Sequence, residues 1–200
     1  MSRFPRAQFL LSAADPAQFP ADRGAEVAFA GRSNAGKSSA LNAITARRAL
    51  ARTGKTPGQT RLVNFFSLDD GLRLVDLPGY GYAGVPEAER RRWGPLIEAL
   101  RLRESLRGLF LIVDARRGVS ASDEQLIAWA DPQRRRVHVL LSKADKLGSG
   151  EARRTLAAAA GTLAGRATVQ LVSAHTRAGV DEAQAVLAEM LGAGGQKKPR

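Results

Sequence analysis

Apolar and polar stretches alternate along the chain in a way that predicts strands and helices in turn. Apolar runs rich in β-branched and aromatic residues predict six strands. These runs are Glu26–Ala30, Leu62–Leu68, Leu72–Asp76, Leu109–Asp114, Val137–Leu141 and Thr168–Val172. Helical patterns between them predict helices near Lys37–Leu50, Pro86–Arg103, Ser122–Ala130, Glu151–Leu163 and Val180–Leu191. Asp69-Asp70-Gly71 predicts a tight hairpin turn.

This order of elements predicts an α/β fold with three layers. We expect a six-stranded, mostly parallel sheet with helices on both faces and, from the hairpin, one antiparallel strand at an edge. Ligands of such sheets bind at the carboxyl ends of the strands. We interpret residues 1–23 as an N-terminal extension, 24–192 as one folded domain, and 193–200 as a flexible basic C-terminal tail.

The first strand leads into a phosphate-binding pattern. Gly31 to Ser38 reads GRSNAGKS, which matches G-x-x-x-x-G-K-[ST] and precedes a helical stretch. The two glycines let the backbone wrap a phosphate chain, and the helix N-terminus adds partial positive charge. Lys37 is predicted to reach the β- and γ-phosphates, and Ser38 to bind Mg²⁺. The pattern therefore predicts binding of a nucleoside triphosphate.

A second motif, DLPG, follows the strand that ends at Asp76. Asp76 is predicted to hold the Mg²⁺ shell, and the Gly79 N–H to sense the γ-phosphate. The alternative, an aspartate that caps a Pro-Gly turn, is less favoured downstream of a phosphate loop. The polar loop TGKTPGQT, which ends at Thr60, could close a threonine hydroxyl on Mg²⁺ only when a γ-phosphate is present, and we favour Thr60 over Thr56.

The motif SKAD, which follows a later strand and ends at Asp145, predicts which nucleobase the protein binds. A carboxylate accepts hydrogen bonds from guanine N1–H and its exocyclic amine, whereas adenine offers an acceptor at N1 and no amine there. Lys143 would lay its aliphatic stem along the base. The last strand is followed by Ser173-Ala174-His175, and the Ala174 N–H could donate to guanine O6. We therefore predict guanine specificity.

The amino-acid composition indicates which classes of binding partner the protein has. The chain has 31 Lys and Arg against 19 Asp and Glu, a net charge of +12, which favours polyanionic partners such as nucleic acid. An arginine-rich composition from a GC-rich genome is the alternative explanation. The lack of cysteine excludes disulfides, thiolate metal sites and cysteine-linked lipid anchors. No apolar run approaches the ~18 residues of a membrane span, and no signal peptide is evident, so we expect a cytoplasmic protein.

Together these motifs resemble those of translation-factor-type GTPases. More narrowly, GRSNAGKSS, TPGQT and DLPGYGYA resemble the EngB (YihA/YsxC) family of bacterial ribosome-assembly GTPases over residues 24–192. The resemblance implies the P-loop GTPase fold, binding of GTP and GDP with Mg²⁺, and GTP hydrolysis. It also implies a switch that acts in assembly of the large ribosomal subunit, in contact with rRNA and assembly intermediates, with a linked role in cell division and septation.

The resemblance assigns site residues one by one. The nucleotide-binding positions are Gly31, Arg32, Ser33, Asn34, Ala35, Gly36, Lys37, Ser38, Ser39, Gly58, Gln59, Thr60, Asp76, Pro78, Gly79, Ser142, Lys143, Ala144, Asp145, Ser173, Ala174 and His175. Catalytic roles fall to Lys37, Thr60 and Gly79. The Mg²⁺ ligands are Ser38, Thr60 and Asp76.

Three positions modify this expectation. Ser142 stands where the base motif usually opens with Asn or Thr, and its shorter reach predicts lower affinity with guanine selectivity retained. Asn34 occupies the position at which related potassium-stimulated GTPases hold K⁺. Tyr80 stands where small signalling GTPases place a glutamine, and a phenol of pKa ~10 is a poor base. We predict slow intrinsic hydrolysis, about 10⁻⁴ to 10⁻² s⁻¹, until a partner stimulates it.

Basic residues near the two switch loops are candidates for rRNA contacts. They are Arg47, Arg48, Arg52, Lys55 and Arg61 beside the first loop and Arg90–Arg92 after the second. A solvated helix face is the alternative for the last three. Trp93 and Trp129 are expected in the core, and His138 and His175 in structural or peripheral positions.

Two other functions remain open. One is a GTP-regulated adaptor of the division apparatus or of a membrane surface, which the lack of a lipid anchor disfavours. The other is an ATP-dependent small-molecule kinase, which Asp145 disfavours. A monomer is the default oligomeric state, and we expect no integral membrane association.

Overall fold

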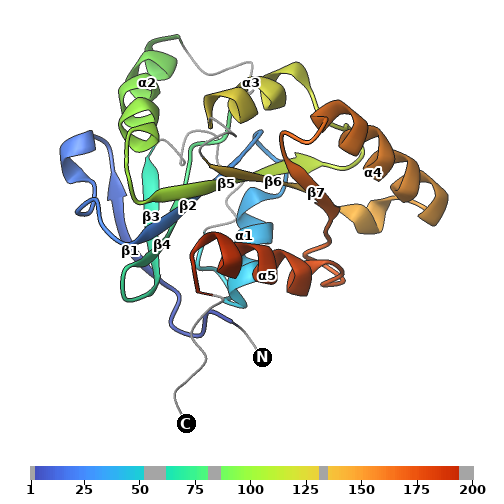
Figure 1. Ribbon diagram of the computed structural model, residues 1–200, viewed down its shortest axis with the longest axis horizontal. Coiled ribbons are helices and arrows are strands. Elements are labelled where there is room, and N and C mark those ends of the chain that lie inside the picture. The colour runs from blue at the N-terminus through green and yellow to red at the C-terminus, as the bar shows by residue number, and fades with distance from the viewer. Residues whose placement is uncertain (1–2, 52–61, 81–86, 131–134, 194–200) are drawn as a thin grey trace.

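The chain folds into one sheet covered by helices on both faces, shown in Figure 1, a computed structural model that describes residues 3–51, 62–80, 87–130 and 135–193. The strand order is β1-β3-β4-β2-β5-β6-β7. The strands are β1 (Gln8–Ala13), β2 (Ala25–Gly31), β3 (Val63–Asp69), β4 (Leu72–Asp76), β5 (Leu106–Asp114), β6 (Arg136–Ser142) and β7 (Thr168–Leu171). The α-helices are α1 (Lys37–Thr45), α2 (Glu87–Arg101), α3 (Ala121–Trp129), α4 (Ser149–Leu163) and α5 (Val180–Met190), and the 3₁₀ turns are η1 (Pro16–Gln18) and η2 (Ala144–Lys146).

The central strand β2 packs against helices on both sides. Val27 and Phe29 belong to the core that α1 and α5 cover, and Phe29 stacks on Phe110 of β5 with the ring centroids 5.0 Å apart. Ala28 and Ala30 face the core beneath α2, α3 and α4. Because both faces are buried, β2 is a continuous apolar run after Glu26 rather than an alternating one, which is typical of parallel strands in α/β proteins. The predicted α/β class with helices on both faces is confirmed.

The predicted count of six strands is wrong, because Gln8–Ala13 forms a seventh, β1. β3 pairs antiparallel with β4 and also with β1, so the antiparallel strand lies inside the sheet and not at its edge as predicted. β1 escaped detection because most of its side chains are exposed, which leaves no buried alternation to mark it. Its Phe9 is 55% exposed and meets Phe66 of β3 edge to face, with 5.9 Å between the ring centroids.

The predicted hairpin turn is confirmed between β3 and β4. Asp70 and Gly71 connect the strands, and Gly71 has a φ of 70°, in the left-handed region that glycine adopts most easily. Gly24 passes so close to this turn that a Cβ atom on it would lie 2.0 Å from the Gly71 carbonyl oxygen. The Ala25 N–H donates to that same oxygen at 2.8 Å, so the turn aligns the start of β2 with β4.

A buried carboxylate holds the first residues of β2. Glu26 is fully buried and accepts hydrogen bonds from two arginines. Arg73 of β4 donates through Nε at 2.7 Å, and Arg103, just before β5, donates through Nε at 2.7 Å and Nη2 at 2.9 Å. The three side chains join the starts of three neighbouring strands. One carboxylate cannot neutralise two cations, so further acceptors are needed.

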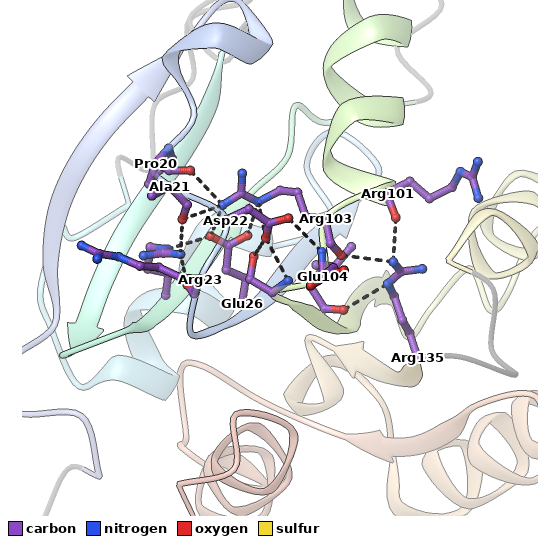
Figure 2. A network of polar contacts seen from close by, with 12 residues as sticks. Pro20, Ala21, Asp22, Arg23, Glu26, Arg101, Arg103, Glu104 and Arg135 are labelled. Atoms are coloured by element: carbon purple, nitrogen blue, oxygen red, sulfur yellow. Dashed lines mark hydrogen bonds and ion pairs between the residues drawn. The ribbon is translucent and has the colours of Figure 1, made fainter.

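Main-chain carbonyls supply those acceptors, as Figure 2 shows. Arg73 donates to the Ala21 carbonyl at 3.0 Å, and Arg103 donates to the Pro20 and Ala21 carbonyls at 3.0 and 3.2 Å. Nearby, Arg135 donates to the carbonyls of Arg101 and Leu106, which lie at the end of α2 and the start of β5. These bonds hold the segment that precedes β2 against the amino-terminal ends of the parallel strands, opposite their carboxyl ends.

Two aromatic positions confirm their predicted structural roles. Trp129 of α3 packs against the core beneath α2, α3 and α4. His138 of β6 is buried between Thr168 and Gln170, with its Nδ1 2.7 Å from Thr168 Oγ1 and its Nε2 3.0 Å from Gln170 Oε1. Burial lowers the pKa of this histidine, so the neutral ring is its native form.

We expect Glu26→Ala to lower the free energy of unfolding by about 3–5 kcal/mol, because it removes the carboxylate that two buried arginines share and leaves Arg103 with the more distant Asp22, whose Oδ1 lies 3.8 Å from its Nε. Chemical denaturation measures this loss. Glu104→Ala is the matched control, since Glu104 is an exposed acid in the same region, and its loss should change the free energy by no more than about 0.5 kcal/mol. Equal effects of the two variants would show that the network does not anchor β2.

Candidate functional site

The predicted phosphate loop lies between the end of β2 and the start of α1. A Cβ atom on Gly31 would lie 2.6 Å from the Ile112 carbonyl oxygen, so only glycine fits where the loop leaves the sheet. Asn34 and Gly36 have φ values of 64° and 94°, in the left-handed region. These two residues turn the chain so that α1 begins at Lys37 with its N-terminus at the loop.

Lys37 and Asp76 come together at the centre of the site. The ammonium of Lys37 is hydrogen-bonded to the carboxylate of Asp76, and both residues are buried, with 8% and 2% of their surface exposed. The pair joins the first turn of α1 to the end of β4. Ser38, the predicted Mg²⁺ ligand, follows Lys37 in the first turn of α1.

The segment after Asp76 packs directly on the phosphate loop. Tyr80 donates its N–H to the Gly31 carbonyl at 3.3 Å and accepts the Ser33 N–H at 2.9 Å. A Cβ atom on Gly79 would lie 3.4 Å from the backbone of Ser33, so the Pro78-Gly79 turn touches the loop. The backbone after Asp76 and the phosphate loop are thus in direct contact.

The side chain of Tyr80 extends toward α3. Its hydroxyl donates to Asp123, a buried carboxylate that also accepts the Ser120 N–H at 2.8 Å and the Ser120 hydroxyl at 2.6 Å. Burial and the bond to Asp123 raise the pKa of the phenol well above its ordinary value. Tyr80 thus stays protonated, which agrees with the prediction that it is no general base.

The base motif reaches back to the phosphate loop. The Ser142 hydroxyl donates to the Ala35 carbonyl, and the Val113 carbonyl lies 3.1 Å from it. Lys143 donates from Nζ to the Asn34 carbonyl at 2.6 Å. Although Ser142 is shorter than Asn, its hydroxyl still joins the end of β6 to the loop.

The residues predicted to recognise guanine lie beside these contacts. Ser173 donates its hydroxyl to Asp145 at 2.6 Å, and this bond lowers the pKa of Asp145, so the carboxylate is ionised and acts as an acceptor. Ser173 in turn accepts the Thr176 N–H at 3.1 Å, which orders the loop around Ala174. These groups border a pocket of about 740 Å³, lined by residues that include Gly36, Ser39, Ser142, Lys143, Asp145, Ala174, His175, Arg47 and Arg48.

Several predicted positions lie outside the described residues. Gly58, Gln59 and Thr60, with the alternative Thr56, fall in residues 52–61, as do Arg52, Lys55 and Arg61. The side chains of Arg90–Arg92 and Trp93 are likewise outside the description. Their predicted roles stay predictions. Within the described ranges, no group of three or more His, Asp or Glu side chains gathers as a metal site.

Sequence reasoning missed two buried aspartates that border the phosphate loop. Asp114 ends β5 and binds Lys143, and Asp123 receives Tyr80. Asp114 could have been found, because it ends a buried strand in the same way as Asp76 and therefore lies at the same sheet edge. Asp123 gave only the signal of a capping box with Ser120.

Comparison with known proteins identifies the family. A family model described as "50S ribosome-binding GTPase" matches residues 26–143. A probable GTP-binding protein EngB from Azoarcus sp. (strain BH72) is 50% identical over 196 residues, covering 96% of this chain and 94% of the relative. A probable GTP-binding protein EngB from Coxiella burnetii (strain CbuG_Q212) is 48% identical over 190 residues, covering 93% of each chain. The chain belongs to the EngB family of GTPases.

EngB membership settles the reaction: the protein binds guanine nucleotides and hydrolyses GTP. Solved structures agree on the fold. A crystal structure of a probable GTP-binding protein EngB aligns with a TM-score of 0.68 at 21% identity, covering 84% of this chain and all of the other. Era in complex with MgGDPNP and nucleotides 1506–1542 of 16S ribosomal RNA aligns with a TM-score of 0.62 at 19% identity, covering 89% of this chain and 59% of the other.

None of the helices in the described ranges combines the length and the apolar character that crossing a bilayer requires.

We expect Tyr80→Phe to change the single-turnover rate of GTP hydrolysis by less than about threefold, because a phenol held protonated on Asp123 transfers no proton. Rapid-quench measurement without any partner tests this. A loss of the order of a hundredfold, the size expected for a missing acid or base, would place the hydroxyl in the reaction.

Proposed function

We propose that this EngB-family GTPase is a nucleotide-controlled factor that binds the large ribosomal subunit during its assembly and leaves after hydrolysis. The observation that carries the proposal is the direct packing of Gly79 and Tyr80 on the phosphate loop. A segment that touches the phosphates' cradle can change position with the γ-phosphate and so alter a binding surface.

The same geometry supports the roles of the phosphate-site residues. On nucleotide binding, Lys37 exchanges the carboxylate of Asp76 for phosphate oxygens, and the Gly79 N–H donates to the γ-phosphate. Asn34 to Ser38 supply the loop amides at the helix N-terminus. These interactions stabilise charge on the γ-phosphate as it transfers to water.

Mg²⁺ fits the carboxylate of Asp76 that Lys37 leaves when it binds phosphate. Ser38 and Asp76 are oxygen ligands, which Mg²⁺ prefers, and the metal commonly takes only one or two protein groups beside phosphates and waters. Thr60 would join them in the GTP state. When bound between these residues, Mg²⁺ would supply positive charge that offsets the negative charge of the phosphates.

Asp145 and its neighbours support guanine as the base. The ionised carboxylate accepts from N1–H and the amine, the stem of Lys143 lies along the base, and Ala174 donates its N–H to O6. Adenine would leave Asp145 without a donor, which disfavours the kinase alternative.

The ribosomal partner is supported by the family description and by charge. The matching family model is named for binding to the 50S subunit, and the net charge of +12 favours RNA. Arg47 and Arg48 line the nucleotide pocket. Their contacts with rRNA phosphates could therefore depend on whether a nucleotide is bound. A ribosomal partner implies a cytoplasmic location. We retain the monomer as the default oligomeric state, and the proposal includes a linked role in septation.

We expect the protein loaded with a non-hydrolysable GTP analogue to co-sediment with large ribosomal subunits at physiological salt, and the GDP-loaded protein to stay in the supernatant. Lys37→Ala, which removes the phosphate contact, is the control and should bind equally weakly with either nucleotide. Equal binding in both states that disappears as salt rises would mean that the basic charge merely finds RNA. Vesicles of anionic lipid in parallel test the membrane alternative.

We also expect K⁺ to raise the rate of GTP hydrolysis severalfold over Na⁺ at equal ionic strength, through an ion held near Asn34. Single-turnover rates in the two salts measure the effect. Asn34→Ala should make the rates equal while GDP binding persists. Equal rates in the unaltered protein would remove K⁺ from the mechanism.

A further inference from the structure

Asp114 lies beside the base motif without being part of it. It is the last residue of β5, and the parallel register sets it opposite Ser142, the last residue of β6. Its side chain is 6% exposed. The neighbouring Ala115 donates its N–H to the Ser142 carbonyl at 2.9 Å, so the backbone after Asp114 is fastened to the start of the base motif.

Lys143 connects Asp114 to the phosphate loop. Its Nζ lies 3.0 Å from Asp114 Oδ2 and 2.6 Å from the carbonyl oxygen of Asn34. Lys143 and Asn34 have φ values of 59° and 64°, which non-glycine residues adopt only at a cost. Two strained backbone positions are thus joined through one ammonium group, and Asp114 is the charged partner of that group.

Arg116 completes the arrangement from the solvent side. It donates from Nε at 2.9 Å and from Nη2 at 2.7 Å to Asp114, and its own N–H donates at 3.1 Å. The guanidinium of Arg116 and, to a smaller extent, the ammonium of Lys143 hold the pKa of Asp114 well below its usual range. The carboxylate therefore remains charged at neutral pH, and Lys143 always faces an anion.

We propose that Asp114 is a positioning residue for guanine-nucleotide binding, and that it acts through Lys143. The carboxylate fixes the ammonium where it can hold the Asn34 carbonyl, and so fixes the stem that supports the base. Asp114 itself touches no part of the nucleotide. This inference rests on the proposed guanine site, because it assumes that Lys143 lies against the base.

A competing explanation is purely structural. Asp114 could serve only to order the loop after β5, through its fork with Arg116. That role would lower stability but would not depend on Lys143. The two explanations differ in whether the effects of substitutions at Asp114 and Lys143 on nucleotide affinity are independent.

A double-mutant cycle on the full chain decides between them, with the dissociation constant for GDP as the measurement. Lys143→Ala and Asp114→Asn are each expected to weaken GDP binding by about tenfold. Asp114→Asn added to Lys143→Ala should weaken binding by less than about twofold more. Arg116→Ala, which removes the exposed partner of Asp114 and leaves Lys143, should change affinity little.

Each result has a distinct meaning. If Lys143→Ala leaves GDP affinity unchanged, the proposed guanine site is wrong. If Lys143→Ala weakens binding but the effect of Asp114→Asn is absent or simply multiplies with it, Asp114 does not act through Lys143. Should Asp114→Asn fail to fold in a thermal melt, Asp114→Glu, which keeps the charge but displaces the oxygens, carries the same cycle with the same expectations.

Discussion

One buried carboxylate shared by two arginines determines where the central strand of this protein begins. Glu26 joins β2 to Arg73 of β4 and to Arg103, just before β5, and the loop before β2 contributes its carbonyls to the same arginines. Five residues later the strand ends at Gly31, against Ile112, and the phosphate loop begins. Glu26 and Gly31 lie at opposite ends of the same strand. The ionic cluster at the start of β2 therefore helps to fix the position of the nucleotide site at its end.

The site could be predicted from sequence where its chemistry is local. The phosphate loop, Asp76 and Asp145 each follow a buried strand, and a parallel sheet brings the ends of such strands to one edge. The structure accordingly brings Lys37 onto Asp76 and Ser173 onto Asp145. The helices were predicted for the same reason, because helical patterns are a local property of the chain, although α1 ends at Thr45 and not at Leu50 as predicted.

Contacts between distant residues could not be predicted in this way. The hydroxyl of Tyr80 meets Asp123, 43 positions further along the chain, and no local pattern records that they pair. The strand β1 was missed because an edge strand needs to bury little, so its sequence carries no alternation. Asp114 lay at a predicted strand end, but its link to the base motif depends on the side-chain direction of Lys143, whose left-handed backbone no pattern reveals.

The outer position of β1 has a practical consequence for anyone who shortens the chain. β3 is a full-length strand with Phe65 and Phe66 at its middle, and β1 occupies its outer row of backbone hydrogen-bonding groups. A fragment that starts at Gly24, just before β2, would keep every nucleotide-binding motif yet present that row to other molecules. Open strand edges of this kind recruit further strands, so the fragment would be prone to aggregation. The first residues of the chain thus protect the solubility of the rest.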